Sequence, residues 1–140
     1  MRKIYETEED RKNERRIVEE VLMEGEKALK MGYKHQIDFL VVDQQWRGKS
    51  VIEVKKRKGT FGKYPDVMLS LLKWNKGIEF KRNNRLDFLF VVEWDDGIFM
   101  HRYEDLIHYT IGMGGRTDRD DAQDIEPVVY VPNKKFTQMA

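Results

Sequence analysis

The sequence contains no cysteine, which excludes both a disulfide framework and a thiolate metal site. Its three histidines, at positions 35, 101 and 108, lack the spacing of zinc ligands, and this argues against a structural zinc. No segment approaches the roughly 20 apolar residues that a membrane-spanning helix needs. The charged N-terminal stretch has no apolar run of the kind found in signal peptides. We therefore expect a soluble, cytoplasmic protein that does not associate with a membrane.

Internal repeats, low-complexity tracts and linkers rich in proline, glycine or serine are also missing. The 140 residues suit one domain built around one hydrophobic core. Hydrophobic residues, at 40%, can fill that core, while charged residues, at 36%, indicate a strongly charged surface. We expect one domain over residues 1–140.

The small net charge of +1 hides an uneven distribution of charge along the chain. Residues 36–85 carry twelve basic and five acidic side chains, whereas residues 86–140 carry five basic and eleven acidic ones. A basic central segment indicates an anionic partner, with nucleic acid as the first candidate. On charge alone, the alternative is a solvated surface without a specific partner.

The pattern of apolar residues predicts a mixed α/β domain. A helical pattern begins near residue 8 and continues through residues 17–29, although residues 27–31 could instead form a short strand. A second helix is predicted to begin at Pro65. Residues 112–126, rich in glycine and acidic side chains, are interpreted as a loop. Five strands are predicted, the first two as a hairpin, at residues 36–43, 49–58, 86–94, 98–103 and 127–132.

The predicted hairpin contains two carboxylates and a lysine that together suggest catalysis. Alternation along its second strand places Glu53 and Lys55 on one face and Ile52 and Val54 on the other. Asp38 lies near the start of the first strand, so that pairing of the strands could bring it to Glu53. Such carboxylate oxygens suit Mg²⁺, which can activate water and neutralise a scissile phosphate. Lys55 could orient or deprotonate the water or stabilise negative charge.

Two further observations bear on this pattern. The same Glu-x-Lys spacing recurs at residues 79–81, but there it falls in or just after a predicted helix, where side chains two positions apart do not face each other. Glu14 falls near the centre of the apolar stripe on a helical wheel. A carboxylate on a buried face is costly without a partner, which a metal or Lys55 could provide. The alternative is a solvated Glu14 one turn before the core begins.

The acid Glu14 on a helix, followed by the segments IDFLVVD and SVIEVKKR, resembles the PD-(D/E)XK nuclease superfamily. More narrowly, these features resemble small endonucleases of bacteriophages and archaeal Holliday junction resolvases, in which a helix glutamate precedes the motif aspartate by a similar interval, here about two dozen residues. Ile37 stands where the motif name has proline. The resemblance covers residues 10–94, and the segments KYPDVMLSLLKW and GGRTDRDDAQDIEPVVYVP resemble phage proteins.

The resemblance implies a restriction-endonuclease-like α/β fold, in which helices flank a central mixed β-sheet. It implies a Mg²⁺-dependent endonuclease, with Mn²⁺ as a substitute, that hydrolyses phosphodiester bonds of duplex or branched DNA by one-ion or two-ion chemistry. If a phage encodes the chain, it would act in the cytoplasm of the host cell. The catalytic residues would be Glu14, Asp38, Glu53 and Lys55, and the metal ligands would be Asp38, Glu53, the Val54 carbonyl and Glu14.

Basic and aromatic residues around the motif are candidate contacts for nucleic acid, with exposed, solvated charge as the alternative. They are Lys56, Arg57, Lys58, Lys63, Tyr64 and Lys73. Because one small domain cannot easily embrace both DNA strands, we expect a homodimer with two sites. Two other functions remain open: a non-catalytic nucleic-acid-binding module that keeps the nuclease fold, and an interaction protein whose acidic C-terminal third binds a basic partner.

Overall fold

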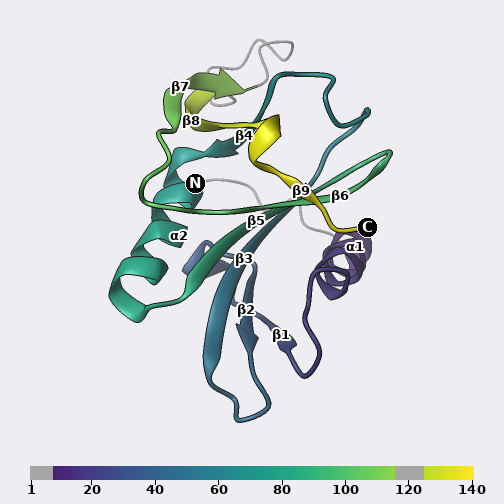
Figure 1. Cartoon of the computed structure of the whole chain (residues 1–140), viewed down its shortest axis with the longest axis vertical. Coiled ribbons are helices and arrows are strands. Elements are labelled where there is room, and N and C mark those ends of the chain that lie inside the picture. Colours follow the sequence, from purple (N-terminus) through teal and green to yellow (C-terminus); the bar gives the residue numbers. More distant parts are fainter. Residues whose placement is uncertain (1–7, 116–124) are drawn as a thin grey trace.

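A six-stranded mixed sheet, in the order β1-β2-β3-β5-β6-β9, lies at the centre of the computed structural model, which describes residues 8–115 and 125–140 (Figure 1). Strands β3 and β5 run parallel, and every other neighbouring pair in this sheet is antiparallel. The strands are β1 (Lys27–Lys30), β2 (Phe39–Val42), β3 (Gly48–Lys56), β5 (Asp87–Trp94), β6 (Gly97–Arg102) and β9 (Thr137–Gln138).

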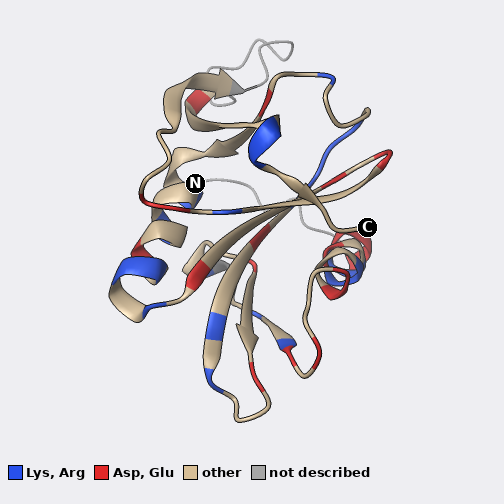
Figure 2. Ribbon diagram, in the orientation of Figure 1, with Lys and Arg blue, Asp and Glu red and all other residues tan. Residues whose placement is uncertain are grey.

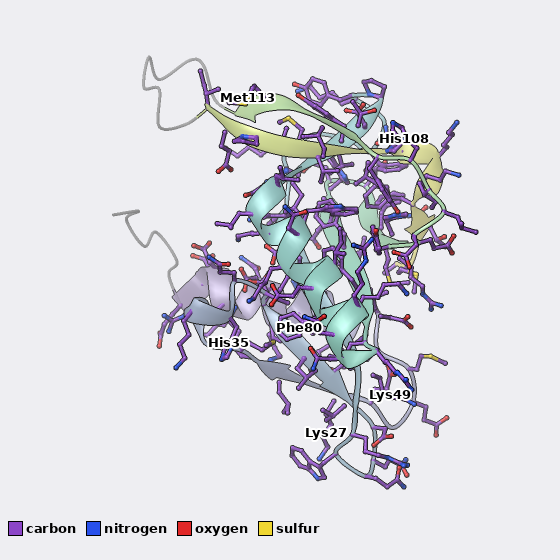
Figure 3. All side chains as sticks on the ribbon, turned by 90° about the vertical axis from the view of Figure 1, so that its left-hand side faces the viewer. Lys27, His35, Lys49, Phe80, His108 and Met113 are labelled. Carbon is purple, nitrogen blue, oxygen red and sulfur yellow. The ribbon has the colours of Figure 1, made fainter. Side chains whose placement is uncertain are left out.

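A second sheet and two helices cover the faces of the central sheet. The second sheet is antiparallel, in the order β4-β8-β7, and it shares one face with α2, which continues directly from β4. Helix α1 packs on the opposite face. Figure 3 shows α2 running along the central sheet, with Met113 of β7 and Lys27 of β1 toward opposite ends of the molecule. The remaining elements are α1 (Glu8–Glu19), η1 (Tyr33–His35), β4 (Asp66–Ser70), α2 (Leu71–Asn84), β7 (Thr110–Gly115), β8 (Ile125–Pro132) and η3 (Asn133–Lys135).

Two hydrophobic clusters, one on each face of the central sheet, account for this layering. Val54 of β3 packs with Ile17 of α1 in one cluster, while Val51 packs with Trp74 of α2 in the other. Residues 50–54 of β3 and 88–92 of β5 are buried on both faces, and apart from Ser50 and Glu53 they are apolar, as in buried parallel strands. Glu53 is the charged residue within this buried part of β3, with none of its surface exposed.

The predicted α/β architecture, a central mixed sheet flanked by helices, is confirmed. The hairpin is confirmed as β2 and β3, and the strands predicted at residues 86–94, 98–103 and 127–132 correspond to β5, β6 and β8. The alternative of a short strand near residues 27–31 is also confirmed, because α1 ends at Glu19 and β1 follows. Within residues 8–115 and 125–140, no helix is long and apolar enough to cross a membrane.

Two predictions about local structure are wrong. Pro65 precedes the strand β4 rather than a helix, and α2 begins only at Leu71. Val67 and Leu69 are buried while Met68 between them is exposed, and this alternation is stabilised by pairing with β8, which is distant in sequence. Part of the predicted loop at 112–126 is strand, in β7 and β8, since glycines there pair across the sheet; residues 116–124 lie outside the described residues.

A substitution at Gly77 would test the packing of α2 on the central sheet. A Cβ at this position would overlap the ring of Phe88, which is buried in β5. We expect Gly77→Ala to lower the free energy of unfolding by about 1–3 kcal/mol, although alanine has the higher helix propensity by about 1 kcal/mol. Urea unfolding would measure this. Asn75→Ala, at an exposed position of the same helix, is the control, and a Gly77→Ala variant as stable as that control would contradict the packing.

Candidate active site

The β2–β3 hairpin brings Asp38 and Glu53 together. Its register pairs Phe39 with Ile52, and one further step along this antiparallel ladder places Asp38 opposite Glu53. The Oδ2 atom of Asp38 accepts a 2.7 Å hydrogen bond from the backbone N–H of Val54. The two carboxylates predicted to converge therefore lie beside each other at the end of the hairpin.

Glu53 carries an incompletely paired carboxylate into the interior. Its Oε1 lies 3.0 Å from Lys73 Nζ and 3.6 Å from Lys55 Nζ. Its Oε2 is buried and has no hydrogen-bond partner among the described residues. Burial raises the pKa of Glu53 to about 7, and the negative charge of Asp38 acts in the same direction, while the two lysines oppose the rise. A negative charge at this position is therefore costly unless a cation approaches Oε2.

Lys55 and Lys73 both approach the Glu53 carboxylate, but their pKa values shift in opposite directions. Burial lowers the pKa of Lys55, with the Glu53 carboxylate opposing this effect. Burial also disfavours the charge of Lys73, but the Glu53 carboxylate outweighs it, so that the pKa of Lys73 lies above its ordinary value. Lys55 thus has the amine that gives up its proton more readily, and Lys73 is the stable counterion.

Lys73 was selected from the sequence only as a possible contact for DNA or a solvent-facing side chain. It lies in the first turn of α2, which packs on the face of the sheet that Glu53 points toward. The local pattern of α2 carries no signal for this contact, because Lys73 lies opposite the apolar stripe predicted for the helix. Only the packing of α2 on β3 shows where its ammonium group goes.

Glu14 reaches Asp38 through a lysine that the sequence pattern did not single out. Lys30 Nζ lies 3.1 Å from Glu14 Oε2 and 3.5 Å from Asp38 Oδ1. Lys30 ends β1, which pairs with β2. A signal was available, since a strand at residues 27–31 paired with the hairpin would place Lys30 near Asp38. Helix α1, strand β1 and the residue directly before β2 therefore contribute to this side of the site.

The remaining basic candidates do not form one patch. Lys56 lies opposite Glu93 in the β3–β5 ladder, with its Nζ 3.7 Å from Glu93 Oε1. Arg16 of α1 binds the same carboxylate through two 2.7 Å hydrogen bonds, so Lys56 points to the α1 side, away from Glu53. Figure 2 likewise shows basic residues spread over several elements and mixed with acidic ones on α1.

The other basic candidates lie on the α2 side of β3 and in the loop that follows it. Arg57 donates a 3.1 Å hydrogen bond to the carbonyl of Met68; burial lowers the pKa of Arg57, and the nearby Glu53 carboxylate opposes the shift. Lys58 is exposed. Lys63 and Tyr64 are also exposed, with the Lys63 ammonium 5.6 Å from the centre of the Tyr64 ring.

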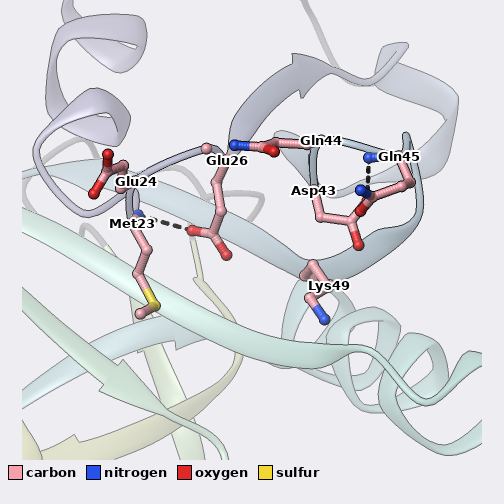
Figure 4. A pocket seen from close by; sticks show the side chains of 8 residues that line it. Met23, Glu24, Glu26, Asp43, Gln44, Gln45 and Lys49 are labelled. Carbon is pink, nitrogen blue, oxygen red and sulfur yellow. Dashed lines mark hydrogen bonds between the residues drawn. The ribbon is translucent and has the colours of Figure 1, made fainter.

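A hollow of about 310 Å³ lies elsewhere, between the α1–β1 connection and the turn of the β2–β3 hairpin (Figure 4). Two of its carboxylates already accept backbone hydrogen bonds, Glu26 from Met23 and Asp43 from Gln45. None of the candidate catalytic residues lines it. Its lining residues are Met23, Glu24, Gly25, Glu26, Asp43, Gln44, Gln45 and Lys49.

The donor atoms around Glu53 fit a hard divalent cation. Asp38 and Glu53 supply carboxylate oxygens, and the unpartnered Glu53 Oε2 is the kind of buried atom that a cation would satisfy. Among the residues that the structure describes, no three acidic or histidine side chains gather closely enough to hold an ion. An ion here would therefore keep water ligands and use backbone oxygen, as Mg²⁺ readily does.

Comparison with known proteins identifies a family and a distant structural similarity. Residues 1–139 match the model of a family described as "Phage putative PDDEXK endonuclease". No curated protein matches the chain. A similar solved structure is that of Archaeoglobus fulgidus Hjc, a Holliday junction resolvase from an archaeal hyperthermophile, at 16% sequence identity and a TM-score of 0.45 over 67% of this chain and 72% of that chain.

The buried charge of Glu53 has a consequence for stability. Because its pKa rises from 4.5 to about 7 on folding, the folded protein loses stability as the pH increases between these values. In the absence of metal, Glu53→Gln should increase the free energy of unfolding at pH 8, by about 1–3 kcal/mol, and have little effect near pH 5. Urea unfolding in chelator at both pH values would measure this.

Glu79→Gln is the matched control, because Glu79 belongs to the other Glu-x-Lys segment and its side chain is 56% exposed. It should change stability similarly at both pH values. A Glu53→Gln variant that is destabilised equally at pH 5 and pH 8 would show that the carboxylate is well compensated in the fold.

Proposed function

This chain belongs to the PDDEXK endonuclease family of phages, and on that basis we propose that it is a metal-dependent endonuclease that hydrolyses phosphodiester bonds in DNA. The observation that carries the proposal is the convergence of Asp38, Glu53 and Lys55, with one buried Glu53 oxygen that lacks a partner among the described residues. A protein that only binds DNA gains nothing from inward carboxylates, because they repel phosphate.

Each residue of this centre has a distinct role in the proposal. Asp38, Glu53 and the Val54 carbonyl would hold the ion, Mg²⁺ or Mn²⁺ as its substitute. The ion supplies an acidified water and a positive charge for the scissile phosphate. Lys55, two residues after Glu53 on the same strand, orients the attacking water, accepts its proton or donates to a phosphate oxygen. Glu14 completes the site next to Asp38.

The lowered pKa of Lys55 supports its place beside the water. Burial favours the neutral amine, which can accept a proton more readily than an exposed lysine at the same pH. Lys73 holds the Glu53 carboxylate at 3.0 Å, through the same oxygen that Lys55 approaches, so that this carboxylate is oriented before substrate arrives. Glu53 and Lys55 both pair with β5, and Glu53 directly follows the last β3 residue that pairs with β2, which limits the movement of both groups.

The substrate in this proposal is duplex or branched DNA in the cytoplasm of the host cell. Phosphates would be bound by Arg57, Lys58, Lys63 and Tyr64 and by Lys73 when Glu53 is engaged by metal. Since one domain presents one catalytic centre, we expect a homodimer in which two centres act together on the two strands.

Cleavage assays would test the catalytic assignment. The wild type should cut supercoiled plasmid, linear duplex or a four-way DNA junction with Mg²⁺ or Mn²⁺ and should be inactive in chelator. Lys55→Ala and Asp38→Asn should each lower the cleavage rate by about 100-fold or more, because each removes a group that acts on the reacting atoms. Rates would be measured on gels with protein in excess over DNA.

The matched control for cleavage is Lys81→Ala, which removes the lysine of the other Glu-x-Lys segment, in α2. It should keep wild-type activity. Cleavage that persists in both Lys55→Ala and Asp38→Asn would remove the proposed centre. Binding of DNA with no cleavage of any substrate would favour the non-catalytic nucleic-acid-binding module.

DNA binding should depend on one side of β3. Lys58→Ala and Lys63→Ala should each weaken binding and reduce the slope of log affinity against log salt by about 0.9 for each duplex phosphate that the variant no longer neutralises. Lys56→Ala should leave both quantities near wild type, because Lys56 pairs with Glu93 on the α1 side. Fluorescence anisotropy in chelator at several salt concentrations would measure this, and the reverse ranking would place DNA on the α1 face.

A further inference from the structure

Asp38 lies between two positions that can hold positive charge. Its Oδ2 is turned toward β3, where it accepts the Val54 hydrogen bond and neighbours Glu53. Its Oδ1 is turned toward Lys30, whose Nζ is 3.5 Å away. The first position has an unpartnered carboxylate oxygen from Glu53 among the described residues, whereas the second already contains an ammonium group.

The ammonium of Lys30 is held in its position from several directions. Glu14 Oε2 lies 3.1 Å from it, and the centre of the Phe39 ring lies 5.1 Å from it. Lys30 is also the register partner of Phe39 in the β1–β2 ladder, so the side chain extends along that ring. The guanidinium of Arg15 donates a 2.7 Å hydrogen bond to the Ala28 carbonyl and thereby ties α1 to β1.

Partial burial strengthens these contacts. The side chains of Lys30, Glu14 and Asp38 are 35%, 23% and 16% exposed. At such positions two carboxylates on one ammonium group repel each other, and the positive charge between them offsets this repulsion. A divalent ion could supply this positive charge, since a metal between two carboxylates is a common arrangement in two-metal sites that process phosphate esters. In this chain the ammonium group of Lys30 supplies it.

We propose that the ammonium of Lys30 takes the place of a second metal ion between Glu14 and Asp38, so that the site binds one divalent ion, at Asp38 and Glu53. This inference rests on the proposed function and decides between the one-ion and two-ion chemistry that the sequence resemblance leaves open. Lys30 is then a positioning residue: it holds the Asp38 carboxylate toward the single ion, and Glu14 acts on Asp38 through Lys30.

The arrangement of acids agrees with this assignment. Among the described residues, Glu14, Asp38 and Glu53 do not gather into a group of three that could hold an ion, and Lys30 lies between the first two. An ion entering between Glu14 and Asp38 would meet a like charge at close range, so binding there requires displacement of the lysine.

The number of bound ions tests the proposal directly. Mn²⁺ binding to the full chain would be followed by the electron paramagnetic resonance signal of free Mn²⁺, without DNA, at pH 8. The wild type and Lys30→Arg should bind one ion, in a manner that depends on Asp38 and Glu53. Lys30→Met should bind two, with the second at least about tenfold tighter than any second ion of the wild type.

Two further variants control this experiment. Lys27→Met removes the other lysine of β1, whose ammonium lies over Trp46 rather than between carboxylates, and it should bind one ion. Lys30→Met combined with Glu14→Gln should return to one ion, because the second pair of carboxylates is gone. Without metal, Lys30→Met should unfold at a lower temperature than the wild type, and Mn²⁺ should raise its unfolding temperature more.

Two results would overturn the inference: two ions in the wild type with Lys30 present, or one ion in a folded Lys30→Met variant. If Lys30→Met does not fold without metal, folding on addition of Mn²⁺ with two ions bound supports the inference, and failure to fold at saturating Mn²⁺ overturns it. Failure of the proposed function has a different signature, because cleavage would then survive Asp38→Asn and Lys55→Ala at any ion count.

Discussion

The buried carboxylate of Glu53 is the constraint on which the rest of the site depends. It lies in a strand that is buried on both faces, where neighbouring positions are apolar, and it lies next to a second carboxylate, Asp38. Desolvation and this like charge both oppose its ionisation. Lys55, Lys73 and the proposed metal ion all reduce the cost of burying the ionised Glu53 carboxylate. The position of this one acid therefore explains why positive groups gather around it.

The layers of the fold supply these charges from separate directions. The central hairpin holds Glu53 and Lys55 on β3 and Asp38 directly before β2, and each covering helix adds a side chain: Lys73 from α2 and Glu14 from α1. The edge strand β1 contributes Lys30. Paired strands are rigid supports for such groups, which explains how a small domain can keep several like charges close together. The stability lost at Glu53 is offset by two hydrophobic clusters.

The parts that the sequence predicted well are those governed by short-range periodicity. The alternation of IEVK places Glu53 and Lys55 on one face in any strand, and the apolar segments at 36–43 and 86–94 indicate strands without reference to the rest of the chain. Residues 66–70 were mistaken for the start of a helix because their partner, β8, is about 60 residues away along the sequence. The glycine-rich β7 was missed for a different reason: its partner β8 is the next strand along the chain, but glycine is atypical of strands.

From its sequence alone, the chain determines an α/β fold, the β2–β3 hairpin and the identity of the acids and the lysine in its motif, because these depend on the order of neighbouring residues. Tertiary structure alone decided which cations besides Lys55 accompany those acids. Lys73 and Lys30 meet Glu53 and Asp38 through the packing of α2 on β3 and the pairing of β1 with β2. The physical reason is that a salt bridge requires a few ångströms of proximity in space, and separation along the chain does not encode it.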